Sequence, residues 1–266
     1  MIGVAGCGRM GAPMLAALRA GGLDARGYDI RPPSEFGELT PAMTDGAGAF
    51  AADLSVLFTV VRDIDQTEDV LFGAQNFSAA PHLTHIVICS TLSPNYVIAL
   101  RDRIADHIAL VDAPMSGAQI AAREARLSFM LGGDAADLQS LDPALQAMGQ
   151  HFHHMGPFGA GMQAKVLNNL LAAGSTAMTR LVLDWADQAG LDETALLNLI
   201  TTSSGQNWFA SGYDKIEFAR DGYSEDNTIG ILVKDVNSAL DSAPDGADTS
   251  LPETVRDLIR DLKPRR

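Results

Sequence analysis

Three glycines near the N-terminus constrain the fold of this chain more than any other feature. Gly6, Gly8 and Gly11 form a Gly-x-Gly-x-x-Gly pattern that follows the short apolar run 2–5 and opens a helical pattern. In such a loop the first glycine permits a tight turn, the second lets the backbone approach a pyrophosphate, and the third lets helix and strand pack closely. An acidic residue, Asp29, follows about twenty positions on, at the end of the next strand-like run. This order and spacing predict a parallel βαβ unit that binds a dinucleotide.

The residues after the second predicted strand bear on which dinucleotide is bound. A carboxylate at Asp29 is placed to bond the ribose hydroxyls of NAD and to repel the 2′-phosphate of NADP. Arg31, two residues later, is an arginine of the kind that accepts such a phosphate. The acidic residue favours NAD as the cofactor, with NADP as the alternative.

The apolar pattern changes character near residue 157 and predicts two domains. Further buried strands are expected at residues 56–61, 86–89 and 109–111, with a later, antiparallel one at 127–131. From residue 161 to 189 apolar residues recur at steps of three and four almost all round, which predicts one long, buried helix. We therefore expect an α/β fold in which an N-terminal Rossmann-type, doubly wound sheet (residues 1–158) is joined by this helix to an all-helical domain (residues 159–266).

Composition excludes several classes of protein. With 33 acidic and 19 basic residues the net charge is −14, and such a field repels phosphate backbones and anionic lipid surfaces. The longest apolar runs are too short to span a bilayer, the N-terminus does not read as a signal peptide, and two cysteines make no disulfide framework. We expect a cytoplasmic protein with a small-molecule substrate and with no nucleic-acid or membrane partner.

A second candidate segment, residues 112–118, follows a predicted strand and joins a proline to a turn of small residues. Backbone N–H groups around Gly117 and Ala118, together with the Ser116 hydroxyl, can hold a carboxylate. From these residues alone, an ordinary β-turn is the favoured interpretation, and a carboxylate site is the alternative.

A third candidate segment opens the long helix. Lys165 and Asn169 are four residues apart and share one helix face, with Asn168 beside them. A lysine in the first helical turn lies in a positive field that favours its neutral, proton-accepting form. Proton transfer by Lys165 is the favoured interpretation, and a solvated surface lysine is the alternative.

Histidines and cysteines give no metal site. His151, His153 and His154 have no carboxylate or thiol near them in the sequence, so we assign them structural or solvent-exposed roles. Cys7 and Cys89 flank predicted strands and are interpreted as small packed residues.

Together these motifs resemble those of the β-hydroxyacid dehydrogenase family, which includes 3-hydroxyisobutyrate dehydrogenase and tartronate semialdehyde reductase and is akin to 6-phosphogluconate dehydrogenase. The matching stretches follow the family's order along the chain and lie at residues 6–14, 89–94, 112–117, 159–169 and 234–236.

The resemblance implies an oxidoreductase that transfers a hydride between a nicotinamide cofactor and a small β-hydroxy acid. It implies that Lys165 is the general acid/base and that Asn169 orients the substrate, whose carboxylate is received at Ser116 and Gly117, next to Ala118. Besides the three glycines, Asp29 and Arg31, it implies cofactor contacts at Arg9, Met10, Val61, Thr91 and Lys234. It also implies pairing of subunits through the helical domain, as a homodimer or a dimer of dimers.

The chain departs from the family pattern in places, and two other functions stay open. Ala118 stands where the family has a second glycine, and the C-terminal segment lacks the pattern of the usual closing helix. An imine reductase-like enzyme is one alternative, although such enzymes usually replace the lysine that this chain keeps. A catalytically silent dinucleotide-binding module is the other.

Overall fold

The computed structural model describes residues 1–265 and divides into two compact units, Met1–Lys165 and Val166–Arg266. The domain boundary proposed from the sequence, between residues 158 and 159, lies directly before the long helix α7 (Ala160–Ala189), whereas the compact units meet within that helix.

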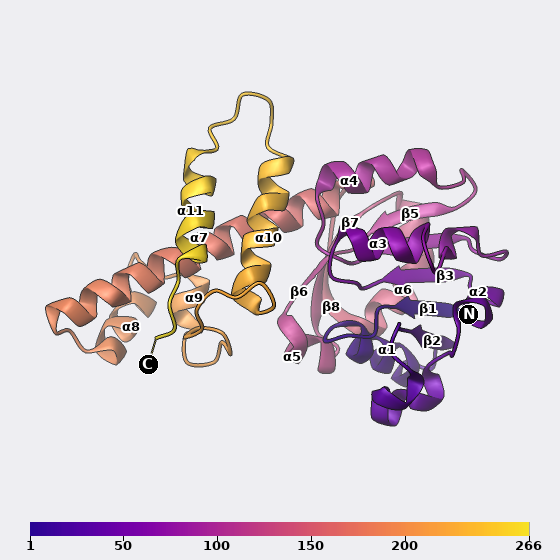
Figure 1. Ribbon diagram of the computed structural model, residues 1–266, viewed down its shortest axis with the longest axis horizontal. Helices are drawn as coiled ribbons and strands as arrows, with labels where there is room; N and C mark the ends of the chain where they lie inside the picture. Colours follow the sequence, from indigo (N-terminus) through magenta and orange to yellow (C-terminus); the bar gives the residue numbers. More distant parts are fainter. Residues whose placement is uncertain (266) are drawn as a thin grey trace. The chain divides into compact units, whose positions relative to one another are not determined.

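Strands and helices alternate along the N-terminal unit (Figure 1). The strands are β1 (Ile2–Ala5), β2 (Ala25–Tyr28), β3 (Val56–Thr59), β4 (His85–Ile88), β5 (Ala109–Asp112), β6 (Met115–Ser116), β7 (Leu127–Gly132) and β8 (Gly149–Gly156). The helices are α1 (Gly11–Ala20), α2 (Ala47–Ala52), α3 (Ile64–Leu71), α4 (Pro94–Ala99), α5 (Ala118–Arg123) and α6 (Ala135–Met148), with 3-10 helices η1 (Pro33–Ala42), η2 (Phe77–Ala79) and η3 (Leu100–Arg103).

These strands form one sheet in the order β2-β1-β3-β4-β5-β7-β6, and β8 pairs with β7. Strands β1 to β5 are parallel, with Ile2 opposite both Ala25 and Val56. β7 runs antiparallel to β5 and β6, as expected for residues 127–131. The predicted Rossmann-type α/β unit is confirmed, and β6 and β8 are additions that the sequence pattern did not predict.

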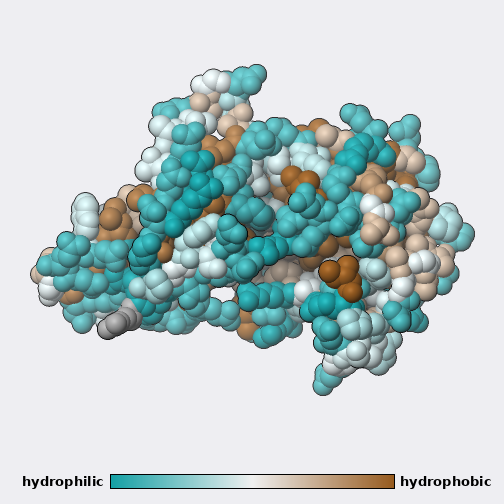
Figure 2. Space-filling view, in the orientation of Figure 1, coloured by the Kyte–Doolittle hydropathy of each residue, from teal (hydrophilic) through white to brown (hydrophobic). Residues whose placement is uncertain are grey.

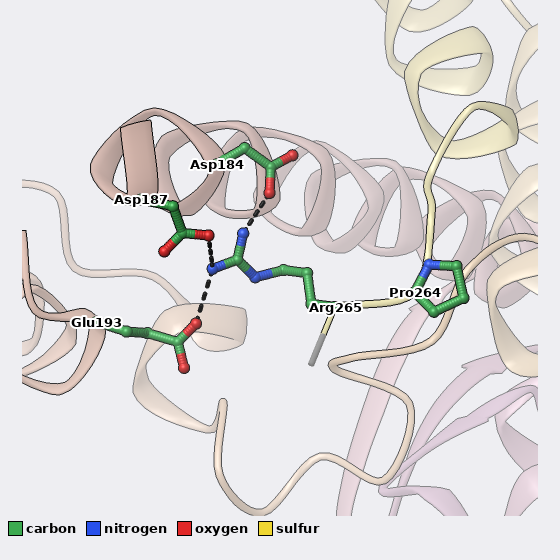
Figure 3. A pocket seen from close by; sticks show the side chains of 5 residues that line it. All are labelled: Asp184, Asp187, Glu193, Pro264 and Arg265. Carbon is green, nitrogen blue, oxygen red and sulfur yellow. Dashed lines mark hydrogen bonds and ion pairs between the residues drawn. The ribbon is translucent and has the colours of Figure 1, made fainter. Parts of the chain in front are cut away.

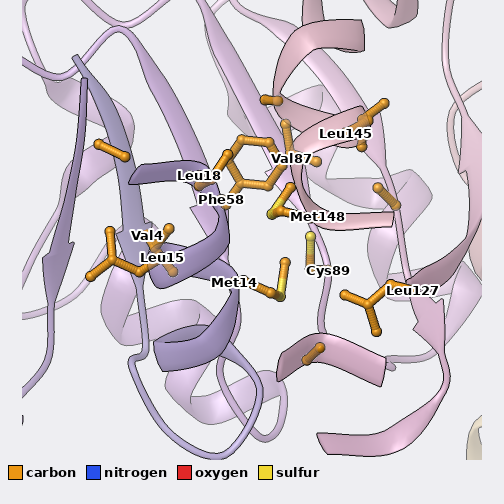
Figure 4. Close-up of a cluster of buried hydrophobic side chains, with 14 of the residues drawn as sticks. Val4, Met14, Leu15, Leu18, Phe58, Val87, Cys89, Leu127, Leu145 and Met148 are labelled. Carbon is orange, nitrogen blue, oxygen red and sulfur yellow. The ribbon is translucent and has the colours of Figure 1, made fainter. Parts of the chain in front are cut away.

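Helices cover both faces of the sheet because successive strand residues point to opposite sides. On one face Val4, Phe58 and Val87 pack against apolar residues of α1, α5 and α6, and Figure 4 shows this cluster. On the other face neighbouring residues such as Ala5 and Leu57 pack against α2, α3, α4 and the 3-10 helices η2 and η3. Both faces are buried, so the strands read as apolar runs rather than as alternating ones.

The C-terminal unit is helical throughout its described residues, as predicted. After α7 it contains α8 (Glu193–Thr201), α9 (Trp208–Ser211), α10 (Thr228–Asp241) and α11 (Ser250–Arg260). One cluster packs Ala173 and Ala177 of α7 against α10 and α11, and a second packs Leu183 against α8 and α9. The helix α11 corrects the expectation that no closing helix is present: its apolar positions are few, which hid the helical pattern, but Ile259 is fully buried.

A fully buried arginine holds the last described residues of the C-terminal unit. The guanidinium of Arg180 donates to the backbone oxygens of Ala219 (2.9 Å), Asp221 (2.8 Å) and Lys263. Because buried carbonyl groups need donors, this arginine supplies hydrogen bonds in place of secondary structure to two loop segments at once.

The long helix is less buried than its sequence predicts. Leu167, Leu171, Met178 and Trp185 are between 51% and 76% exposed in the single chain, whereas Leu183 is buried as expected. They are spaced by four, seven and seven residues and therefore lie on one face of α7. We call these four residues the α7 stripe. Hydrophilic residues predominate on the face of the molecule shown in Figure 2, with small apolar patches between them.

Candidate functional site

The glycine loop between β1 and α1 has the geometry of a phosphate cradle. Gly6 has a φ of +90°, and a Cβ there would lie 2.6 Å from the Val60 carbonyl oxygen. A Cβ on Gly11 would lie 1.9 Å from the carbonyl oxygen of Gly6. A Cβ on Gly8 would meet nothing within 4 Å. The first and third glycines are therefore required by the chain itself, and the second leaves open space beside the backbone where a pyrophosphate fits.

At the end of β2, Asp29 is held by the loop and by Arg31. Its Oδ2 accepts a hydrogen bond from the Cys7 backbone N–H (2.9 Å), and its Oδ1 accepts from Nε of Arg31 (3.0 Å). Arg31 Nη2 also donates to Asp29 Oδ2 and to the Cys7 carbonyl oxygen, each at 3.2 Å. Burial alone would raise the pKa of Asp29, but the hydrogen bonds from Arg31 and the Cys7 N–H hold it below its ordinary value.

Other residues expected at the cofactor lie around the carboxyl ends of the parallel strands. Arg9 is exposed in the glycine loop, whereas Met10 is half-buried against the core. The Val61 backbone N–H, just after β3, donates to the Ser90 hydroxyl (3.0 Å), and Thr91 follows Ser90 after β4. The carboxyl edge is where open α/β sheets bind their ligands.

The substrate residues expected in the N-terminal unit lie together. Lys165 is only 7% exposed, and its Nζ donates to the Ser116 hydroxyl at 3.4 Å. Gly117 has a φ of +130° and Ala118 a φ of +54°. The left-handed conformation at Ala118 is one that alanine adopts at a cost of about 1 kcal/mol, and such strain clusters at functional sites.

Asp112, which no sequence pattern singled out, ties the sheet to α7. Its carboxylate is fully buried at the end of β5 and accepts hydrogen bonds from the backbone N–H groups of Gly159 (2.7 Å), Met162 and Gly161. Burial raises the pKa of Asp112 to about 6, although these N–H groups act to lower it. The group is thus mostly ionised at neutral pH and caps the positive end of the helix.

This cap corrects one argument made from the sequence. Because α7 begins at Ala160, Lys165 lies in the second helical turn rather than the first. The helix-end field falls off within the first turn, and the charge of Asp112 opposes it there. The features that mark Lys165 as a candidate are its burial and its contact with Ser116, and not the field of the helix end.

In the C-terminal unit, Asn169 is bonded to a second carboxylate that the sequence analysis missed. Asn169 Nδ2 donates to Asp235 Oδ2 at 2.6 Å, and its Oδ1 accepts from Asn168 (3.2 Å). Lys234 forms an ion pair with the same aspartate, with 2.8 Å between Nζ and Oδ1. Both ends of the Asn169 amide are therefore fixed in orientation.

A signal for each missed aspartate exists in the sequence. Asp235 occupies a core position of α10, among Leu232, Val233 and Val236, where a charged residue needs a partner. Asp112 ends an apolar strand directly before the small-residue turn. Neither pattern names the partner.

The remaining candidate groups do not form a reactive centre. Cys7 and Cys89 are buried, and burial raises the pKa of both thiols, that of Cys7 to about 12. His151 and His153 are exposed on β8, and His154 bonds the carbonyl oxygens of Gly133 and Gly156. Within residues 1–265 no group of three or more histidine, cysteine or acidic side chains is arranged to hold a metal ion, and no helix is long and apolar enough to cross a membrane.

One pocket in the C-terminal unit is built from ion pairs (Figure 3). The guanidinium of Arg265 lies among Asp184, Asp187 and Glu193, with 2.8 Å from Nη2 to each of the last two carboxylates. Arg265 forms ion pairs with all three carboxylates that line the pocket, so these residues hold the C-terminal tail in place.

The open space at Gly8 gives a test of the cofactor loop. We expect Gly8→Ala to leave the melting temperature unchanged, because the added Cβ meets no atom of the chain. The same substitution should weaken dinucleotide binding about tenfold or more, since one misplaced contact of about 1.4 kcal/mol gives that factor. Fluorescence titration with NAD measures the affinity. Gly48→Ala, another position with open space around it but on helix α2, is the matched control and should leave the affinity for NAD unchanged. Unchanged binding in Gly8→Ala would contradict this assignment.

Comparison with known proteins finds matches to sequence models in both halves of the chain. A sequence model of the NAD binding domain of 6-phosphogluconate dehydrogenase matches residues 1–156. A second, described as NAD-binding of NADP-dependent 3-hydroxyisobutyrate dehydrogenase, matches residues 159–264.

Individual relatives match over nearly their full length. An L-threonate dehydrogenase of Cupriavidus necator is 31% identical over 253 residues, covering 91% of this chain and 83% of the relative. A 3-hydroxyisobutyrate dehydrogenase of Pseudomonas aeruginosa is 30% identical over 265 residues, covering 96% and 89%. The structure of Mycobacterium tuberculosis 3-hydroxyisobutyrate dehydrogenase with L-serine superimposes with a TM-score of 0.80 at 27% identity, covering 98% of this chain and 95% of that one. The chain therefore belongs to the β-hydroxyacid dehydrogenase family, and it is an oxidoreductase that uses NAD or NADP.

Proposed function

We propose that this enzyme oxidises a small β-hydroxy acid of the 3-hydroxyisobutyrate type, with Lys165 as the general acid/base. The observation that carries the proposal is the buried Lys165 amine beside the Ser116 hydroxyl, in the unit that holds the glycine loop. The names of the relatives support the substrate class, because L-threonate, 3-hydroxyisobutyrate and L-serine are all small carboxylic acids with a hydroxyl group.

The bound nicotinamide supplies the acceptor for the hydride that leaves the hydroxyl-bearing carbon. In the proposal, the neutral Lys165 amine takes the hydroxyl proton as the carbonyl forms, and returns it when the reaction runs in reverse. Ser116 and the backbone N–H groups of Gly117 and Ala118 hold the substrate carboxylate, which fixes the distance between the hydroxyl and the amine. Asn169, held by Asp235, orients the substrate.

The first prediction concerns Lys165. We expect Lys165→Ala to lower kcat by about two to four orders of magnitude, the usual span for a lost general acid/base, and to leave the affinity for NAD unchanged. Lys165→Arg should fail as well, because a guanidinium stays protonated and accepts no proton at neutral pH. Turnover is measured with 3-hydroxyisobutyrate, 3-hydroxypropionate, L-serine, glycerate and L-threonate. Lys215→Ala, an exposed lysine of the other unit, is the control.

Two outcomes would overturn the proposal. Near-normal turnover of both Lys165 variants would remove the lysine from the chemistry. Tight NAD binding without turnover of any hydroxy acid would favour a catalytically silent module.

The second prediction concerns the choice of cofactor, for which we propose NAD. The Asp29 carboxylate lies where it repels a 2′-phosphate, and Arg31 is already paired with it. We expect kcat/KM to favour NAD over NADP by about tenfold or more, since one unfavourable charge contact of about 1.4 kcal/mol gives that factor. Asp29→Ser should free Arg31 and erode the preference, whereas Arg31→Ala should preserve or widen it. A wild-type enzyme that prefers NADP would contradict the proposal.

The third prediction concerns assembly, for which we propose a homodimer through the α7 stripe. Four large apolar side chains on one helix face are more than a monomer's helix usually exposes, and the family resemblance implies pairing through the helical domain. We expect light scattering to give about twice the chain mass of 28.1 kDa for the wild type and the single mass for Leu171→Glu. Leu199→Glu, equally apolar and exposed but on α8, should remain dimeric. A monomeric wild type at micromolar concentration would refute the dimer.

A further inference from the structure

We infer that Asp112 is a positioning residue, whose carboxylate ties the start of α7 to the end of β5 and so sets the place of the Lys165 amine. The inference rests on the proposed role of Lys165 in proton transfer. Asp112 itself is buried behind the helix start and touches the backbone, so it acts through the lysine.

The carboxylate satisfies the helix end almost completely. The first backbone N–H groups of a helix have no partner within it. At α7, Asp112 accepts from Gly159, Gly161 and Met162, and the Ala160 N–H donates to the Pro157 carbonyl oxygen at 2.9 Å. A side chain 47 to 50 residues earlier in the sequence thus takes the place of a local cap.

The same short segment holds the helix at a second point. Four residues beyond Asp112 the chain reaches Ser116, whose hydroxyl accepts from Lys165 Nζ. Residues 112–116 therefore grip the first turn of α7 through Asp112 and the second turn through Ser116. Releasing the first grip frees the helix to shift or rotate relative to Ser116, and a misplacement of about 1 Å is enough to cost two orders of magnitude in rate.

The surroundings leave the carboxylate no alternative position. A Cβ on Gly132 would lie 2.2 Å from Asp112 Oδ1, and a Cβ on Gly161 would lie 2.9 Å from Oδ2. Cys89, directly after β4, is a titratable neighbour, and its pKa is raised by its own burial and by the charge of Asp112. An asparagine at position 112 would have the same shape as the aspartate. Its NH₂ group cannot accept a hydrogen bond, so at least one of the hydrogen bonds from the backbone N–H groups of α7 would be lost.

A double-mutant cycle on kcat tests the inference. We expect Asp112→Asn to lower kcat about tenfold to a hundredfold in the wild-type background, while the affinity for NAD changes less than about twofold. In the Lys165→Ala background the same substitution should change the residual kcat by less than about twofold, because the lysine it positions is gone. Asp192→Asn is the matched control: it removes the N-cap carboxylate of α8 and should leave kcat unchanged.

A second variant covers the case in which Asp112→Asn does not fold. Gly132→Ala keeps the carboxylate but drives a methyl group against its Oδ1, and it should show the same dependence on Lys165. Losses that multiply with Lys165→Ala, or an Asp112→Asn enzyme within about twofold of wild type, overturn the inference. Full activity of Lys165→Ala alone would instead refute the proposed function, so the two failures are distinguishable.

Discussion

The buried carboxylate that caps α7 is the interaction on which the start of this helix, and with it Lys165, depends. A helix of thirty residues has one N-terminus, and here that end is bonded to the last residue of a central strand. Lys165 follows five residues after the helix begins, and the two clusters of the C-terminal unit pack on the remainder of the same helix. An error at Asp112 would therefore displace the first turns of α7, which carry Lys165.

The glycine loop shows two separate physical reasons for the same residue type. Gly6 and Gly11 are fixed by contacts inside the protein, where a side chain would overlap a carbonyl oxygen. Gly8 has no such neighbour, and the proposed pyrophosphate contact would account for its lack of a side chain. The loop is also tied to Asp29 through the Cys7 N–H, so the residues proposed to hold the pyrophosphate and the ribose are held as one piece.

Sequence reasoning succeeded where the signal is local and failed where it is not. The βαβ unit, the parallel strands and the helical second half follow from apolar periodicity and glycine spacing, which operate over a few residues. The partners of Asp112 and Asp235 lie 47 to 66 residues away, and no short-range pattern specifies them. Strand β8 escaped prediction because its residues from Gln150 to Met155 are exposed, and its histidines broke the apolar pattern. For the α7 stripe the apolar pattern predicted a buried helix face, but it did not show that no other part of the single chain covers these four side chains.

The burial of Asp112 also couples the stability of the N-terminal unit to protons. The pKa of Asp112 is about 6 in the folded chain, against an ordinary value of 3.8. Between these two pH values the folded state keeps a proton on Asp112 that the unfolded state has released. Stability from this group therefore falls as pH rises from about 4 to 6, by about 3 kcal/mol in all, and stays lowered above that range. At neutral pH the carboxylate is ionised, and because a buried charge costs free energy, the unit is easier to unfold than it is with Asp112 protonated. Mild acid would make the same unit harder to unfold while loosening its hold on the helix that carries the lysine.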